Sequence, residues 1–285
     1  MCTTGIVSAT RPNGEKVVLM GKTQEFLEAP MWHGYSFQEG KNTSLAFGLA
    51  GQLGYNSGLN EKGLCMMLSF LDYRGPFEAD PEEKPNKAVW SGDERGLAIA
   101  HILTNYSNVE DAISYLTDYL PEIPLDCPGG NFHIADASGK VAIFEYCEGR
   151  SQYKIYEEGF TARGNNGLLI LQEEQEKLSE VVRFDRLNRY NTAIKAMEKI
   201  KQDITNGATR DDAVNAYKEL FKIHHPEGSD KPGTICTHNL WIPGGRTTLT
   251  TAHTISAAIF DLVNKEMLFT RGTPCTAEWE ILSLE

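Results

Sequence analysis

The sequence begins Met1-Cys2-Thr3-Thr4-Gly5, and Cys2 is the residue whose type and position point most directly to covalent chemistry. Methionine aminopeptidase removes an initiator methionine when the next side chain is small, so we expect the mature chain to begin at Cys2. A terminal cysteine combines a nucleophilic thiol with a free α-amine that accepts its proton. A model-peptide amine has a pKa of roughly 7.7 to 8.0 and a thiol roughly 8.5, so the two exchange a proton near neutral pH.

The residues after Cys2 predict a β-hairpin. Residues 3–9 and 16–21 are rich in β-branched and apolar side chains, and they flank the turn formers Arg11-Pro12-Asn13-Gly14. Cys2 is therefore expected at the tip of a strand.

The rest of the chain alternates between blocks of strands and blocks of helices. Strands are predicted over residues 131–135, 141–147, 153–156 and 160–163, as a meander, and over 247–260 and 267–271. Helices are predicted over residues 93–119 (two helices), 173–200 and 209–221. Blocks of this kind favour segregated layers over alternating βαβ units.

Two helix starts and one loop have clear local signals. Ser107 and Glu110 have the spacing of a capping box, and Thr209 and Asp212 have the same spacing before the last helix. The clearest loop is 226–233, which is rich in proline, glycine and charged residues.

Length and composition favour one cytoplasmic domain. The chain has 285 residues with 41% hydrophobic content, enough for a large core, and we expect a single domain over 1–285. No stretch approaches the roughly 18 apolar residues of a membrane span. The amino terminus also lacks the basic and hydrophobic regions of a secretory signal, so the predicted compartment is the cytoplasm.

The cysteines indicate a reduced state of the thiols, and the net charge excludes one class of partner. Six cysteines show no CxxC spacing in a chain too long to need disulfides, so we expect reduced thiols, which a nucleophile requires. A formal net charge of -12 argues against nucleic acid, whose phosphates demand basic patches. A small molecule is the expected partner, with no membrane and no nucleic acid.

The chain resembles the choloylglycine hydrolase and penicillin V acylase family of amino-terminal-nucleophile (Ntn) hydrolases, and the related acyl-CoA:6-aminopenicillanic acid acyltransferases. Six segments have the family's order and spacing. They are Met1-Cys2-Thr3 with the hairpin, Gly58-Leu59-Asn60-Glu61-Lys62-Gly63-Leu64-Cys65, 106–116, 133–140 with Glu145, Gly164-Asn165-Asn166, and 179–183. The resemblance implies an α+β fold with four layers, in which two antiparallel sheets lie between helical layers.

The resemblance also implies a mechanism. Cys2 would attack an amide carbonyl, form a thioester and relay its proton through its own α-amine, after which water would release the acid. Asn165 matches the asparagine that donates to the oxyanion. The second donor is Phe70 by ungapped counting from Asn60, or Ser69 if one residue is missing. Arg183 matches the arginine that completes the polar network around the nucleophile.

The sequence departs from the family close to Cys2. Family members carry an arginine and, three residues later, an aspartate at the end of the hairpin, and here these positions are Lys22 and Glu25. Lysine keeps the charge that favours a thiolate but loses the planar guanidinium, and glutamate is one methylene longer. The two residues could instead be an exposed pair at a strand end. A non-catalytic binding protein on the same scaffold is therefore one alternative.

Several of these residues have ordinary structural interpretations. Asn165-Asn166-Gly167 is also a good turn, and Arg183 could be solvated beside Arg186 and Arg189 as an exposed basic ladder. The residues 31–37 form an aromatic cluster that is either a loop by the site or a buried turn. No metal is expected, because His224, His225, Cys236, His238 and His253 lack CxxC or HExxH spacing, and no cofactor motif is found.

The sequence thus predicts a cysteine amidohydrolase that cleaves a linear amide of an N-acyl substrate. We expect an apolar acyl group, because pockets are usually lined by hydrophobic side chains and the loops after Ala29 and over 68–73 offer them. Bile-salt conjugates, penicillin V and N-acyl amino acids all fit. The alternative is an acyltransferase that passes the acyl group from Cys2 to an amine. The resemblance leans towards a homo-oligomer.

Overall fold

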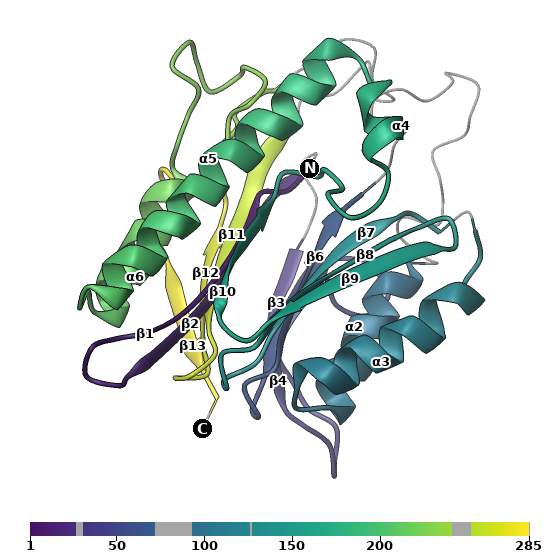
Figure 1. Cartoon of the computed structure of the whole chain (residues 1–285), viewed down its shortest axis with the longest axis vertical. Coiled ribbons are helices and arrows are strands. Elements are labelled where there is room, and N and C mark those ends of the chain that lie inside the picture. The colour runs from purple at the N-terminus through teal and green to yellow at the C-terminus, as the bar shows by residue number, and fades with distance from the viewer. Residues whose placement is uncertain (27–30, 72–92, 126, 241–251, 285) are drawn as a thin grey trace.

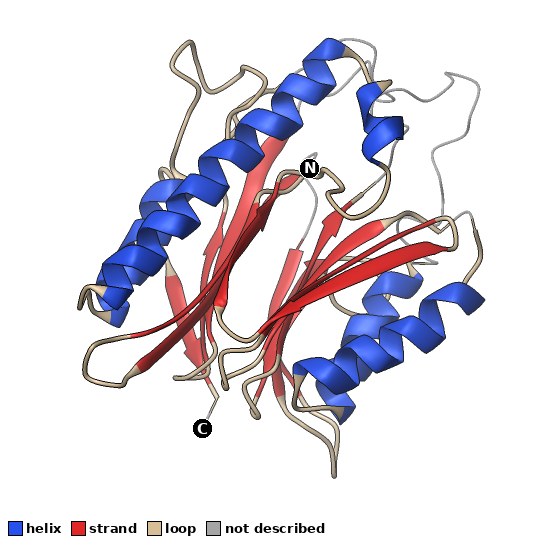
Figure 2. Cartoon of the chain, in the orientation of Figure 1, coloured by secondary structure: helices blue, strands red, loops and turns tan. Residues whose placement is uncertain are grey.

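The computed structural model describes residues 1–26, 31–71, 93–125, 127–240 and 252–284. Two antiparallel sheets lie face to face, with helices on their outer sides (Figures 1 and 2). The six-stranded sheet has the order β10 (Gly159–Arg163), β1 (Thr4–Thr10), β2 (Lys16–Phe26), β11 (His253–Asp261), β12 (Glu266–Arg271) and β13 (Glu280–Ser283). The seven-stranded sheet follows the chain: β3 (Met31–Ser36), β4 (Ser44–Leu49), β5 (Ser57–Asn60), β6 (Cys65–Phe70), β7 (Gly130–Ala135), β8 (Val141–Cys147) and β9 (Arg150–Tyr156).

Helices cover the outer face of each sheet (Figure 1). The helices α5 (Glu180–Thr205) and α6 (Arg210–Phe221) pack on β1, β2 and β10 of the six-stranded sheet. On the other side α2 (Glu94–Asn105) and α3 (Val109–Tyr119) pack on β5 to β8. The short 3-10 helix η1 (Leu120–Glu122) follows α3, and the short helix α4 (Gln172–Glu176) precedes α5. None of the helices in the described ranges combines the length and apolar character needed to cross a bilayer.

An apolar core fills the space between the sheets. Ile6 and Met20 from one sheet and Phe47 and Met67 from the other are almost fully buried in one cluster. Strands of both sheets therefore alternate between this central core and the helical layers, which is the arrangement expected of stacked sheets. The α+β sandwich confirms the predicted four-layer fold class, whereas the extent of one domain over 1–285 stays a prediction.

The amino-terminal hairpin is confirmed, and it is longer than predicted. Strand β2 continues to Phe26, so Lys22 and Glu25 lie inside a strand. The prediction that residues 160–163 form the fourth strand of the meander is wrong about the sheet. The strand β10 belongs to the six-stranded sheet, where it pairs with β1 and places Arg163 opposite Thr4. This crossing brings the segment after β10 to the beginning of the chain.

Two smaller predictions also need correction. Helix α3 has Asn108 as its N-cap, whose side chain accepts a hydrogen bond from the Asp111 N–H, so the predicted Ser107 cap is one residue too early. The aromatic segment 31–37 is neither a loop nor a buried turn, because residues 31–36 form the edge strand β3, and Tyr35 in this strand and Phe37 just after it are well exposed. The Thr209–Asp212 capping box is confirmed. Residues 247–251 of the predicted last hairpin lie outside the described residues.

Candidate active site

Cys2 lies immediately before β1 and is enclosed by three elements. Its side chain is buried, and its backbone N–H donates to Asn165 Oδ1 over 2.7 Å. Its thiol faces Gln24 Oε1 at 3.7 Å. The register of the hairpin sets Thr4 opposite both Lys22 on β2 and Arg163 on β10. The start of β1, the end of β10 and the interior of β2 therefore lie side by side next to Cys2.

Asn165 follows β10 in a left-handed backbone conformation, with φ of 69°. Asparagine tolerates this region better than most non-glycine residues, and such conformations often mark functional positions. Its Oδ1 accepts from Cys2 N and, over 3.2 Å, from Arg189, which fixes the orientation of the amide. Its Nδ2 donates to the Phe70 carbonyl over 2.8 Å. An amide nitrogen has two hydrogens, so one remains to stabilise an oxyanion.

The loop that carries Asn165 is held by a buried carboxylate. Glu145 on β8 accepts from Arg163 over 3.0 Å and from the N–H groups of Leu168, Leu169 and Ile170 over 2.9 to 3.1 Å. A carboxylate with several charged and backbone donors is a strong anchor. Glu145 is therefore a positioning residue for the Asn165 segment.

Glycine at position 164 lets helix α5 approach this loop. A Cβ at Gly164 would lie 2.5 Å from the Arg186 carbonyl oxygen. A side chain at this position would push α5 away from the residues that face Cys2.

Lys22 and Glu25 are fully buried beside the nucleophile, so the alternative of an exposed pair is wrong. The Lys22 ammonium donates to Asn56 Oδ1 and to the Leu68 carbonyl. Burial lowers the pKa of Lys22, and the neighbouring Cys2 raises it. The Lys22 side chain therefore lies next to the Cys2 thiol.

Glu25 meets the beginning of the chain. Its carbonyl accepts from the Met1 amine over 2.8 Å, and its N–H donates to the Met1 carbonyl over 2.9 Å. Burial raises the pKa of its carboxyl, and the amino terminus and Arg189 lower it. Its Oε2 is buried and has no hydrogen-bond partner among the described residues. Glu25 thus offers an unsatisfied acceptor beside the terminal amine.

The structure does not bring Arg183 to Cys2; Arg189 lies there instead. Arg189 donates to the Cys2 carbonyl over 2.6 Å and pairs with Asp185 over 2.7 Å, and both side chains are buried. The other oxygen of Asp185 accepts from Gly233 N over 2.8 Å. The ion pair therefore joins the nucleophile to α5 and to the 226–233 loop.

The periodicity of α5 explains why Arg183 is the wrong arginine. The buried positions of the helix share one stripe with the 3- and 4-residue spacing of a packed face, and they are Val182, Asp185, Arg186, Arg189, Ala193, Met197, Ile200 and Ile204. Arg183 lies off this stripe and is exposed. The expected exposed ladder of Arg186 and Arg189 is therefore also wrong. Asp185 and Arg189 could have been found from the sequence, because an acid and a base four residues apart on an otherwise apolar helix face indicate a buried ion pair.

The two candidate oxyanion positions on β6 differ in where they point. Ser69 is buried, with its hydroxyl 3.4 Å from His133 Nε2 and accepting from Asn131 Nδ2 over 3.2 Å. Phe70 is next to the site through its carbonyl, which binds the Asn165 amide. The structure brings Phe70 to Asn165 and turns the Ser69 side chain towards His133. The second oxyanion donor stays a prediction.

Asn60 of the Asn-Glu-Lys-Gly segment has a structural role. Its amide donates to the carbonyls of Leu103 and Tyr106, each over 2.8 Å, and its Oδ1 accepts from Lys62 N and Leu64 N. It ties the end of α2 to the β5–β6 turn.

Replacing Asn165 with glycine tests its role as a donor. Glycine tolerates the left-handed backbone, so Asn165→Gly removes the amide while leaving the turn its conformation. We expect kcat to fall by about 10²- to 10³-fold, the range for loss of one oxyanion donor. Steady-state kinetics check this, with circular dichroism as the control for folding. Unchanged kcat would assign the residue to the turn alone.

Comparisons with known proteins show a shared fold. The penicillin V acylase of Agrobacterium tumefaciens has a similar structure, with a TM-score of 0.60 and 14% identity over 99% of this chain and 86% of that chain. The C2A mutant of conjugated bile acid hydrolase from Clostridium perfringens follows with a TM-score of 0.55 and 12% identity over 100% of this chain and 97% of that chain. No curated protein matches the chain in sequence.

The family model described as acyl-coenzyme A:6-aminopenicillanic acid acyl-transferase matches residues 13–274. The match spans most of the chain, and the two similar structures share the predicted Ntn-hydrolase fold, so the resemblance inferred from the sequence is confirmed. The chain belongs to the acyl-coenzyme A:6-aminopenicillanic acid acyl-transferase family.

Proposed function

We propose that this protein is an amino-terminal-cysteine amidohydrolase that cleaves the C–N bond of a linear N-acyl amide through a thioester. The observation that supports this most is the convergence on Cys2 of a buried lysine and an oriented amide, from Lys22 and Asn165, together with a buried carboxyl, from Glu25, whose pKa the terminal amine lowers. A nucleophile, an oxyanion donor and a group to hold the base are the parts that acyl transfer needs.

The proposed reaction begins with loss of everything before Cys2. Its backbone nitrogen, which donates to Asn165 Oδ1, then becomes a primary α-amine. The Glu25 carboxyl, whose pKa the charge of the terminal amine lowers, has a buried oxygen with no hydrogen-bond partner among the described residues. Glu25 would take the place of the family aspartate in holding this amine. We infer that this buried acceptor binds the new ammonium once Met1 has left.

The chemical steps follow from the geometry. The amine accepts the thiol proton, the sulfur attacks the carbonyl carbon, and the resulting oxyanion accepts a hydrogen bond from the second N–H of the Asn165 amide. The amine then gives the proton to the leaving nitrogen as the C–N bond breaks. Water attacks the thioester in the second half, and the acid leaves as the thiol regains its proton.

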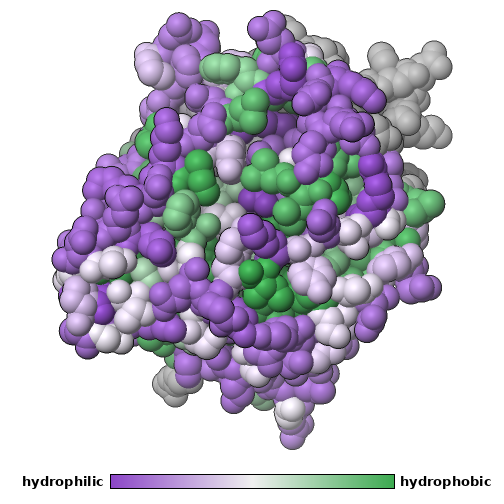
Figure 3. Space-filling view, in the orientation of Figure 1, coloured by the Kyte–Doolittle hydropathy of each residue, from purple (hydrophilic) through white to green (hydrophobic). Residues whose placement is uncertain are grey.

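We infer an apolar acyl group from the surface around the site. Figure 3 shows hydrophobic atoms gathered beside the marked amino terminus of Figure 1, over the loop that follows β10. Leu168 in this loop is 37% exposed, although it is one of the residues bound to Glu145. Of the residues predicted to line the pocket, Ala29, Asp72 and Tyr73 lie outside the described residues.

A panel of substrates tests the proposal. Conjugated bile salts, penicillin V and N-acyl amino acids are incubated with the protein, and the released acid and amine are read by mass spectrometry. We expect equal amounts of both products from at least one class. No release from any of them, by protein whose chain begins at Cys2, would favour the binding-protein alternative.

An acyltransferase is the second candidate, because the matching family model has that description. The same thioester serves both reactions, and only the acceptor differs. Adding a competing amine to the assay separates them: a hydrolase gives mainly the free acid, whereas a transferase gives mainly the new amide.

The burial of Glu25 predicts a pH-dependent stability. Its folded pKa is raised above the ordinary value of 4.5, so between the two values the folded protein keeps a proton that the unfolded chain releases. Stability contributed by this proton is present below the ordinary pKa and is lost as the pH rises through the folded value. We therefore expect Glu25→Gln to gain stability over the wild type as the pH rises through this window.

Urea unfolding at a series of pH values measures the difference. Glu173→Gln is the matched control, because Glu173 is exposed and its replacement should leave the pH profile unchanged. A difference between Glu25→Gln and wild type that stays constant with pH would contradict the assignment of a raised pKa to Glu25.

A further inference from the structure

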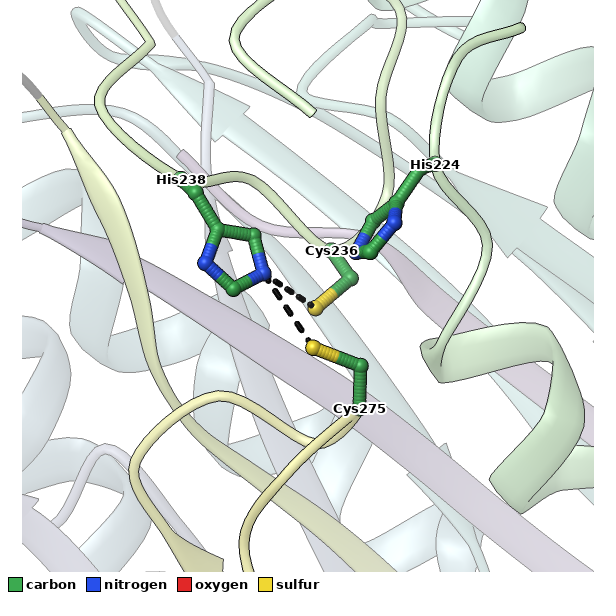
Figure 4. Close-up of side chains that lie close together, drawn as sticks. All are labelled: His224, Cys236, His238 and Cys275. Atoms are coloured by element: carbon green, nitrogen blue, oxygen red, sulfur yellow. Dashed lines mark hydrogen bonds between the residues drawn. The ribbon is translucent and has the colours of Figure 1, made fainter. Parts of the chain in front are cut away.

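Four side chains with metal-binding atoms meet away from Cys2. They come from three segments that are distant in sequence: His224 after α6, Cys236 and His238 in the next loop, and Cys275 in the turn between β12 and β13. Their ligand atoms all lie within 4.8 Å of one another. Figure 4 shows the side chains turned towards a common point.

Two of the separations are close to those around a tetrahedral ion. His238 Nε2 lies 3.7 Å from Cys236 Sγ and 3.2 Å from Cys275 Sγ. With Zn–S of about 2.3 Å and Zn–N of about 2.0 to 2.1 Å, a tetrahedral site separates neighbouring sulfur and nitrogen ligands by roughly 3.6 Å. The observed distances lie on either side of this value.

Hydrogen bonds alone do not account for the arrangement. The ring nitrogen His238 Nε2 has at most one lone pair, so it accepts from one thiol at a time, yet both sulfurs face it. The ring of His224 lies 5.1 Å from that of His238, at 82° to it. A cation at the centre would use all four ligands at once.

We propose that His224, Cys236, His238 and Cys275 bind one Zn²⁺ as a structural site. Two thiolates and two imidazoles form the Cys₂His₂ set that zinc takes in closed, four-coordinate sites. The other histidines of the segment are engaged elsewhere: His225 Nδ1 accepts from Glu227 N, and His253 Nδ1 accepts from Asn239 N. This proposal revises the expectation from sequence that no metal binds.

The zinc site would stabilise the loop around Cys236, which packs against the strands next to Glu25. Cys236 N donates to the Ile223 carbonyl, and the next residue, Thr237, donates its N–H to Thr254 Oγ1 over 2.8 Å. The Thr254 hydroxyl lies 3.5 Å from Glu25 Oε1. A zinc ion would therefore cross-link the loop, the end of α6 and the β12–β13 turn against strand β2.

Metal content and spectroscopy of the whole protein test the proposal. We expect about one zinc per chain by elemental mass spectrometry after purification with zinc present. Replacement by Co²⁺ should give the visible bands of a tetrahedral thiolate site. Chelation of the wild-type protein should lower its melting temperature, and added zinc chloride should restore it, which gives a readout that needs no substitution.

Matched variants locate the ion. Cys275→Ser and His238→Gln should weaken zinc binding by more than about 100-fold, beyond the effect of losing an outer-shell partner. His253→Gln and Cys127→Ala, which change a histidine and a cysteine outside the cluster, should keep one zinc. Competition with a chromophoric chelator measures each affinity.

Two results would overturn the proposal. One is wild-type affinity for zinc in Cys275→Ser. The other is a wild-type protein that binds no zinc under reducing conditions, or whose Cys236 and Cys275 are joined as a disulfide with a mass lower by two hydrogen atoms. Neither result bears on the proposed hydrolase, because the test measures metal and not turnover.

Discussion

Cys2→Ala is expected to lower kcat for amide hydrolysis by about 10⁴-fold or more while the protein remains folded. The substitution removes the sulfur that forms the thioester and keeps the backbone contacts to Asn165 and Arg189. Residual turnover would come from the oxyanion donor and substrate binding alone. Steady-state kinetics on the best substrate of the panel measure the loss, and thermal unfolding checks the fold.

Cys65→Ala is the matched control. Cys65 is fully buried in the core between the sheets, and burial raises the pKa of its thiol well above the usual range. We expect this variant to lose some stability and little activity. Turnover in Cys2→Ala near the wild-type rate would remove Cys2 from the mechanism.

Arg189→Met is expected to destabilise the protein by about 3 to 5 kcal/mol, because it leaves the buried Asp185 carboxylate without its partner. It also removes the hydrogen bonds that Arg189 donates to the Cys2 carbonyl and to Asn165 Oδ1. We therefore expect activity to fall as well as stability. Arg183→Met is the matched control on the same helix. Because Arg183 is exposed, its change should stay within about 0.5 kcal/mol.

A double variant separates folding from catalysis. Asp185→Leu with Arg189→Met replaces the ion pair by apolar side chains, so it should recover much of the stability lost in Arg189→Met. We expect activity to remain low, because the contacts to Cys2 and Asn165 are still missing. If Arg183→Met behaves like Arg189→Met in denaturant unfolding and kinetics, the assignment of the buried arginine is wrong.

The parts of the fold that depend on local signals could be predicted from the sequence. β-Branched and apolar side chains on both sides of Arg11-Pro12-Asn13-Gly14 predicted the hairpin, and Thr209 with Asp212 predicted the cap of α6. Strand partners depend on contacts far apart in sequence, which no local pattern encodes. The segment 160–163 was therefore predicted as a strand but assigned to the wrong sheet.

The site was predictable where a residue's own neighbours identify it. Cys2 was predicted from its position after Met1 and Asn165 from its match to the family asparagine, and the structure brings them together. Arg189 was missed because several arginines follow each other on α5, and only the helical stripe distinguishes the buried one. The four-residue metal cluster was missed because Cys275 reaches the others only through the folding of the β12–β13 turn.

The most direct test of the central claim is a peptide map of active protein quenched with acid during turnover. We predict that the amino-terminal peptide begins at Cys2, without Met1, and that its sulfur carries the mass of the acyl group. Fully active protein whose amino-terminal peptide retains Met1, or whose acyl group is found on another residue, would contradict the proposed mechanism.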